Sequence, residues 1–175
     1  MAPVAVMVGA PGAGKTTVGE TLALRLDVPF ADSDTLIEAV AGKPIPEIFF
    51  DDGEDEFRRL EVETIANALS TFDGVLALGG GAVLREETRA GLRGQTVFYL
   101  SAEFATAIKR VGLGAGRPLL SVNPRATLKH LLDQRRPLYA EVATHTVATD
   151  DREPEEIAAE IAKLLTTGIQ EPPPA

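Results

Sequence analysis

Cysteine is absent from the 175 residues of this chain. The absence excludes disulfide bonds, thiolate metal sites and a cysteine nucleophile. Long apolar runs are also missing, because no stretch approaches the roughly 18 residues that a membrane-spanning helix needs. The first three residues lead directly into a strand-like segment, without the apolar core of a signal peptide. We therefore expect a cytoplasmic protein that does not associate with membranes.

Basic residues are outnumbered, since 17 Lys and Arg stand against 26 Asp and Glu and leave a net charge of −9. This balance argues against nucleic acid as a partner, because phosphate backbones bind basic surfaces. Seven basic residues nevertheless gather between positions 109 and 136, with Asp133 as the one acid among them. They are Lys109, Arg110, Arg117, Arg125, Lys129, Arg135 and Arg136. The segment predicts either a local anionic ligand or an ordinary solvated helix face.

Short apolar segments alternate with helical patterns along the chain. We expect strands at 4–8, 30–32, 74–78, 96–100 and 145–148, and helices at 15–26, 35–40, 46–50, 54–70, 85–92, 102–111, 126–132 and 154–165. The strands are apolar on both faces, which is typical of a parallel sheet covered by helices on two sides. We expect a single domain over residues 1–168 and a flexible tail over 169–175.

A glycine-rich stretch, Gly9-Ala10-Pro11-Gly12-Ala13-Gly14-Lys15-Thr16, follows the first strand and precedes the first helix. It fits the pattern G-x-x-x-x-G-K-[ST], in which backbone N–H groups surround the phosphates of a nucleoside triphosphate. The lysine can reach the outer phosphates, and the threonine hydroxyl can bind Mg²⁺. We expect nucleotide contacts from Gly12, Ala13, Gly14, Lys15, Thr16 and Thr17.

Two carboxylates, Asp32 and Asp34, follow the second strand at its carboxyl end, where ligands bind in open α/β sheets. Residues two apart on an extended chain face the same way, so both side chains are expected to point toward one site. One could act on Mg²⁺, and the other could accept a proton from a substrate hydroxyl. The alternative is that one of them caps the following helix.

The third strand ends in three glycines, Gly79, Gly80 and Gly81, where an ATP-binding chain often carries an acid for the metal. A side chain there would block the close approach of a ligand to the backbone. A plain strand-to-helix turn is the alternative. The chain has no guanine-reading N-K-x-D segment and is too short for an ATPase motor, which leaves the small-molecule kinases.

Six motifs now occur in order between residues 3 and about 165: GAPGAGKTT, DSD, FRRLE, LGGGAV, RPLL and RRPLY. In this order the chain resembles the shikimate kinase family, which uses ATP to phosphorylate the 3-hydroxyl of shikimate on the route to chorismate and the aromatic amino acids. The resemblance implies a three-layer α/β/α P-loop kinase fold with a five-stranded parallel sheet of order 2-3-1-4-5. It also implies a substrate-binding region at about 33–61, a mobile lid at about 112–124, and a monomer.

The resemblance assigns the acceptor side of the site. It implies that Asp32 helps to hold Mg²⁺ and that Asp34 binds shikimate hydroxyls and acts as the base. Arg58 and Arg135 would hold the shikimate carboxylate, with Arg136 facing solvent. Gly80 would donate its backbone N–H to the substrate, and Gly79 and Gly81 would supply room for it. Phe57 is expected to face the core, which leaves the next side chain, Arg58, outside it. Without the resemblance, we would interpret Arg58 as half of a surface ion pair with Glu61.

The nucleotide side follows in the same way. Arg117, in RPLL, resembles the lid arginine that closes over the triphosphate and stabilises charge on the transferring group. Arg110, Arg152 and Pro154 match the positions that the family uses around adenine. The nearest alternatives are another small-molecule kinase of this architecture, such as a gluconate or nucleotide kinase, and a non-catalytic ATP-dependent switch that binds a partner protein.

Overall fold

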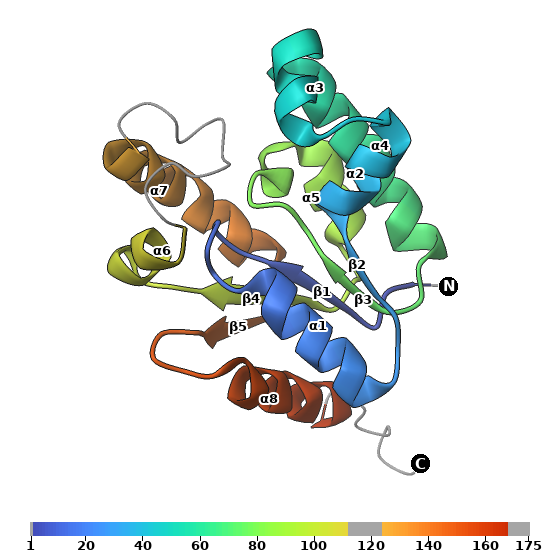
Figure 1. The fold of residues 1–175 in the computed structure, drawn as a ribbon. Coiled ribbons are helices and arrows are strands. Elements are labelled where there is room, and N and C mark those ends of the chain that lie inside the picture. Colours follow the sequence, from blue (N-terminus) through green and yellow to red (C-terminus); the bar gives the residue numbers. More distant parts are fainter. Residues whose placement is uncertain (1, 112–123, 168–175) are drawn as a thin grey trace.

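One central sheet of five parallel strands organises the chain (Figure 1). The structure, a computed structural model, describes residues 2–111 and 124–167. The strands lie in the order β2 (Phe30–Asp32), β3 (Val75–Ala77), β1 (Ala5–Val8), β4 (Val97–Ser101) and β5 (His145–Ala148). This order, 2-3-1-4-5, confirms the predicted sheet.

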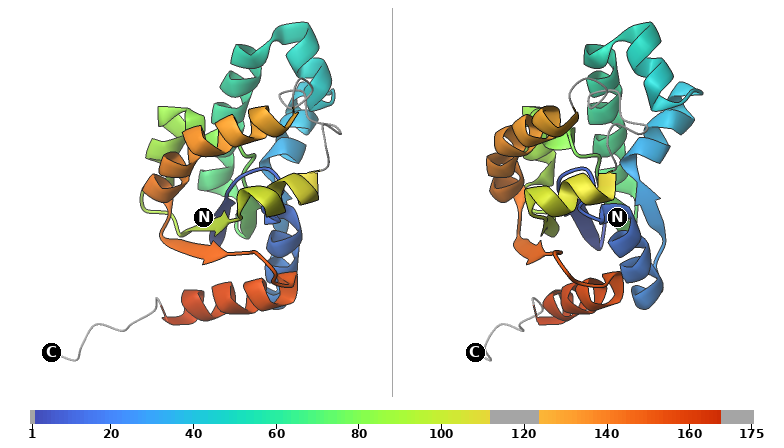
Figure 2. Two further views of the ribbon diagram at one scale, coloured as in Figure 1. Left: turned by 90° about the vertical axis from the view of Figure 1, so that its left-hand side faces the viewer. Right: turned by 60° about the vertical axis from the view of Figure 1, so that its left-hand side comes forward.

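Helices cover both faces of the sheet, which confirms the three-layer arrangement. In chain order they are α1 (Lys15–Leu26), α2 (Ser33–Ala41), α3 (Ile45–Asp52), α4 (Glu54–Thr71), the 3₁₀ turn η1 (Ala82–Leu84), α5 (Glu86–Leu92), α6 (Phe104–Val111), α7 (Pro124–Val142) and α8 (Pro154–Thr167). Figure 2 shows α2 and α3 at one end of the molecule and α8 at the opposite end.

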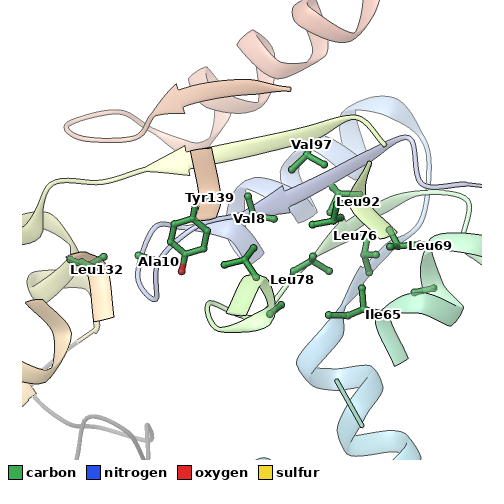
Figure 3. Close-up of a cluster of buried hydrophobic side chains, with 14 of the residues drawn as sticks. Val8, Ala10, Ile65, Leu69, Leu76, Leu78, Leu92, Val97, Leu132 and Tyr139 are labelled. Carbon is green, nitrogen blue, oxygen red and sulfur yellow. The ribbon is translucent and has the colours of Figure 1, made fainter. Parts of the chain in front are cut away.

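The alternation of side chains along β1 divides the core in two. Val6 and Val8 join the larger cluster, which lies under α4, α5, α6 and α7 (Figure 3). Ala5 and Met7 face the other way and join the cluster under α1 and α8. All four side chains are buried, as a strand covered on both faces requires. A third, smaller cluster centred on Ile37 joins α2, α3 and α4.

Helix α7 is longer than the predicted helix at 126–132, because it continues through Pro137 to Val142. An internal proline removes one backbone donor and costs about 3 kcal/mol in a helix. Tyr139 is buried in the core and Leu138 packs against the same cluster, so tertiary packing offsets the cost. The extension matters because it places residues 135–139 on one rigid element. The predicted lid, apart from residue 124, and the predicted tail lie outside the described residues.

Candidate active site

The phosphate-binding loop, residues 9–16, connects β1 to the N-terminus of α1. Gly14 caps α1 with a φ of +91°, a conformation that residues with a side chain rarely adopt. The Lys15 ammonium group folds over the loop and donates to the carbonyl oxygens of Gly9 (2.8 Å) and Ala10 (2.9 Å). A glycine-rich loop at a helix N-terminus, with a lysine beside it, is a site for phosphate.

Asp32 links the phosphate-binding loop to α2. Its Oδ2 accepts a hydrogen bond from the Thr16 hydroxyl at 3.0 Å, and its Oδ1 accepts one from the backbone N–H of Asp34 at 2.9 Å. Asp32 is therefore the N-cap of α2, and Asp34 lies in the first turn of that helix. The expectation that both residues share an extended segment is wrong, because the cap starts the helix two residues earlier than predicted. The two carboxylates still lie at the same edge of the sheet.

The glycine loop, which we define as Gly79, Gly80 and Gly81, follows β3 beside these carboxylates. None of the three has the positive φ that only glycine tolerates well. Each is instead required by a close neighbour, because an added Cβ would lie 2.6 Å from Asp34 Oδ1 at Gly79 and 2.4 Å from Arg58 Nη2 at Gly81. At Gly80 it would lie 2.9 Å from Cδ of Pro11, in the phosphate-binding loop. The space beside Gly79 and Gly81 is therefore taken by the side chains of Asp34 and Arg58, and room for the substrate there stays a prediction.

Arg58 lies on α4 and is buried, with only 5% of its surface exposed. Its Nη1 donates to Glu61 Oε1 at 2.7 Å, and Glu61 is itself 1% exposed. Burial raises the pKa of Glu61, and the neighbouring Arg58 opposes that rise. The expectation that Arg58 projects free of the core is wrong, since the pair with Glu61 exists but lies inside the protein. Nε of Arg58 makes no hydrogen bond among the described residues, although it lies 3.8 Å from Glu54 Oε1 in a long ion pair.

Arg135 approaches the same place from α7. It is 3% exposed, whereas Arg136 is exposed, so the burial pattern distinguishes the two arginines as expected. Burial lowers the pKa of the Arg135 guanidinium, and the charge of Arg58 lowers it further. Within residues 2–111 and 124–167, Arg135 forms no ion pair, and its Nε lacks a hydrogen-bond partner. Two buried guanidinium groups with unused donors at one site favour an anionic ligand with several acceptor oxygens.

A cavity of about 390 Å³ opens on the other side of the phosphate-binding loop. Arg110 lines this cavity and donates hydrogen bonds to the carbonyl oxygens of Gly12 and Ala13 (both 3.3 Å) and to Thr149. Arg152 is held by Glu160 at 2.6 Å. The cavity is lined by Gly12, Ala13, Gly14, Thr17, Val18, Arg110, Arg152, Pro154 and Ile157. It brings together seven of the residues predicted to contact the nucleotide.

Some residues of this site were missed by the sequence interpretation. Thr149 fixes Arg110, and Val18 and Ile157 supply apolar walls for the cavity, but as single residues they carry no motif. Ser33 and Tyr139 contact the glycine loop, and both lie inside motifs that were noticed for their other members. Arg117 lies outside the described residues.

Neither a membrane-spanning helix nor an enclosed metal site occurs among the described residues. Among them no helix is long and apolar enough to cross a membrane. The same residues contain no group of three or more His, Cys, Asp or Glu side chains that could enclose a metal ion. Thr16 and Asp32 supply side-chain oxygen atoms beside the phosphate-binding loop. Such a pair fits a divalent cation that takes its other ligands from phosphates and water.

Comparison with known proteins agrees with this geometry. A family model described as shikimate kinase matches residues 11–166. The shikimate kinase of Salinispora arenicola is 67% identical over 94% of this chain and 99% of that protein. The structure of shikimate kinase from Acinetobacter baumannii in complex with shikimate has a TM-score of 0.92 and 38% identity, covering 98% of this chain and 96% of that one. A gluconokinase from Sinorhizobium meliloti has a TM-score of 0.58 at 21% identity, over 95% of this chain and 97% of that one, and shows a shared fold alone. The chain belongs to the shikimate kinase family.

Proposed function

We propose that the protein transfers the γ-phosphoryl group of ATP to the 3-hydroxyl of shikimate, giving shikimate 3-phosphate and ADP for aromatic amino acid biosynthesis. The observation that carries this proposal is the pair of buried arginines, Arg58 and Arg135, beside a phosphate-binding loop. Two buried guanidinium groups suit a carboxylate, which accepts hydrogen bonds on both oxygens. The related protein from Acinetobacter baumannii was solved in complex with shikimate.

ATP occupies the phosphate-binding loop in this proposal, with its adenine in the cavity formed by Arg110, Arg152 and Pro154. Lys15 contacts the outer phosphates after leaving the carbonyl oxygens that it now binds. Thr16 and Asp32 would hold the divalent cation, which we propose to be Mg²⁺. When bound, the cation would offset negative charge on the phosphate groups.

Shikimate lies on the opposite side of the loop, with its carboxylate between Arg58 and Arg135 and its ring near the glycine loop. Asp34 accepts the proton of the 3-hydroxyl as that oxygen bonds to the γ-phosphorus and the bond to the ADP oxygen breaks. Gly80 donates its N–H to the substrate. In this proposal a substrate-binding region at about 33–61 contributes Asp34 and Arg58, and Arg117 would approach the phosphates from a lid at about 112–124.

The negative charge of the chain and its lack of a membrane-crossing helix among the described residues suit an enzyme of small molecules. We therefore propose a cytoplasmic monomer that binds neither nucleic acid nor membranes. Size-exclusion chromatography with light scattering tests the monomer, and a dimer mass over a range of concentrations contradicts it.

A coupled assay of ADP formation tests the function. Shikimate, gluconate and AMP are offered in separate reactions with ATP and Mg²⁺, and we expect ADP to form with shikimate alone. ADP formation with gluconate or AMP instead identifies a different small-molecule kinase. An absence of product with every acceptor, together with measurable ATP binding, favours the non-catalytic switch.

A further inference from the structure

The glycine loop is held by side chains from two distant parts of the chain. The Ser33 hydroxyl accepts a hydrogen bond from the backbone N–H of Gly79 at 2.9 Å, and the Tyr139 hydroxyl donates to the backbone carbonyl of Gly80. Ser33 is fully buried in α2 and Tyr139 is 1% exposed in α7. Ser33 precedes Gly79 by 46 residues in the sequence, and Tyr139 follows Gly80 by 59 residues.

These contacts leave particular backbone donors available. Within the loop, the carbonyl of Gly79 accepts from Ala82 N–H at 3.0 Å, and the carbonyl of Gly81 accepts from Leu84 N–H at 3.1 Å. The N–H of Gly79 and all three glycine carbonyls are therefore used. The N–H groups of Gly80 and Gly81 donate to no acceptor within residues 2–111 and 124–167. They are the donors that a bound molecule could use.

We propose that Tyr139 and Ser33 are positioning residues that orient the free N–H groups of Gly80 and Gly81 toward the acceptor substrate. A peptide group is planar, and its C=O and N–H point in opposite directions. Tyr139 fixes the Gly80 carbonyl and so also fixes the direction of the Gly81 N–H. Ser33 accepts from the Gly79 N–H and so fixes the peptide group between Leu78 and Gly79. The peptide group that carries the Gly80 N–H lies between these two fixed groups. This inference rests on the proposed function, because it concerns how the same site binds shikimate.

The environment of Tyr139 suits a fixed donor. Its ring stacks on Tyr99 with the ring centres 5.2 Å apart, and Figure 3 shows it beside Val8 and Ala10 in the core. Burial raises the pKa of the hydroxyl to about 12, so the hydroxyl keeps its proton and remains a donor at neutral pH. Arg135, one helical turn earlier on α7, interacts electrostatically with the same hydroxyl. One helix therefore carries both an arginine for the carboxylate and a donor for the loop.

Tyr139→Phe tests the positioning role because it keeps the ring and removes only the hydroxyl. We expect KM for shikimate to rise about tenfold, since loss of one buried hydrogen bond leaves the Gly80 carbonyl unpaired. KM for ATP and kcat should each change less than about threefold, because the phosphate-binding loop keeps its own contacts. Tyr99→Phe is the matched control, because it removes a hydroxyl from the neighbouring stacked ring without touching the loop, and we expect wild-type kinetics from it.

Ser33→Ala gives a second variant from the other side of the loop, and it should raise KM for shikimate in the same direction. If KM for shikimate stays within twofold of wild type in both variants, the proposal is wrong. It is also wrong if KM for shikimate and KM for ATP rise together while the melting temperature falls, because that pattern indicates a purely structural role.

A measurement without turnover separates this inference from the proposed function. The chain has 16 glycines, so protein labelled with ¹⁵N-glycine gives a simple amide spectrum. In the ligand-free Tyr139→Phe protein we expect the Gly80 and Gly81 signals to move and the Gly12 and Gly14 signals to stay. Unmoved loop signals refute the positioning role. If they move although the wild type does not phosphorylate shikimate, the proposed function fails and the positioning of the loop stands.

Discussion

Substitution of Gly81 by alanine should weaken shikimate binding by displacing Arg58. The new Cβ would lie 2.4 Å from Nη2, 2.5 Å from Nη1 and 2.7 Å from Cζ of Arg58, whereas ordinary contact begins at 3.4 Å. The guanidinium group must therefore move by about 1 Å. Arg58 is buried and bonded to Glu61, so it cannot swing into solvent as a surface arginine could.

A displacement of about 1 Å at a binding group can cost about 100-fold, and loss of one charged hydrogen bond costs about 1.5–3 kcal/mol, or roughly 10- to 100-fold. We therefore expect KM for shikimate to rise about 10- to 100-fold in Gly81→Ala. KM for ATP should change little, because the neighbour of Gly81 belongs to α4 and not to the phosphate-binding loop. Overpacking in the core should also lower the free energy of unfolding by about 1–3 kcal/mol.

Two further glycine substitutions make this assay specific. In Gly80→Ala the added Cβ meets Pro11 of the phosphate-binding loop at 2.9 Å, so we expect KM for ATP to rise as well as KM for shikimate. In Gly91→Ala, on α5, the Cβ would meet only Leu69 Cδ1 at 3.3 Å, and kinetics should match wild type. Initial rates over a matrix of shikimate and ATP concentrations give KM for each substrate and kcat for each variant. A folded Gly81→Ala protein with unchanged KM for shikimate refutes the assignment of Arg58 to the carboxylate.

Three other outcomes are expected. Asp34→Asn should lower kcat at least about 100-fold, which is the low end for loss of a general base. Near-normal turnover in quenched-flow assays would show that Asp34 is not the base. Arg110→Ala should raise KM for ATP and leave KM for shikimate within about twofold, because Arg110 lines the cavity and binds the carbonyl oxygens of Gly12 and Ala13 on the nucleotide side. Calorimetric titration with a non-hydrolysable ATP analogue checks the change in ATP affinity. Burial raises the pKa of Glu61, so the native protein holds this proton more tightly than the unfolded protein, and stability falls as pH rises from the usual carboxyl range through the raised native pKa. The free energy of unfolding of Glu61→Gln, measured by urea titration at successive pH values, should not show that decline. If it falls with pH in parallel with that of the wild type, Glu61 is not the group responsible.

The sequence predicts the framework of this site well, because the framework depends on local rules. The pattern of Gly9 to Thr16 between a strand and a helix specifies the phosphate-binding loop without knowledge of distant residues. Alternating strands and helices specify a parallel sheet, and the carboxyl ends of parallel strands share one edge. The positions of Asp32, Asp34 and the glycine loop at that edge follow from these rules alone.

One error comes from a choice between two local patterns, and two come from contacts between residues far apart in the sequence. Asp34 is helical and not extended, because Asp32 caps α2 by accepting its N–H, and strand spacing cannot reveal which of two acids forms the cap. Arg58 is buried because Gly81, on another element, leaves space for its guanidinium group. Helix α7 continues through Pro137 because Tyr139 packs into the core formed by remote segments. For Arg58 and α7 a tertiary contact outweighs a local preference, whereas at Asp34 one local hydrogen bond outweighs another local pattern.

The absence of an acid at the end of β3 follows from these same contacts. A side chain at Gly79 would place its Cβ 2.6 Å from Asp34 Oδ1, so an aspartate there would bring two carboxylates together in a partly buried site. Two neighbouring carboxylates in such a site disfavour each other's ionisation. The acid at the tip of β2 avoids this conflict, because Asp32 turns one oxygen to Thr16 and the other to the start of α2. With Asp32 at the end of β2 and Asp34 in the first turn of α2, a glycine at position 79 avoids the conflict, and the backbone N–H groups of Gly80 and Gly81 remain available to the acceptor.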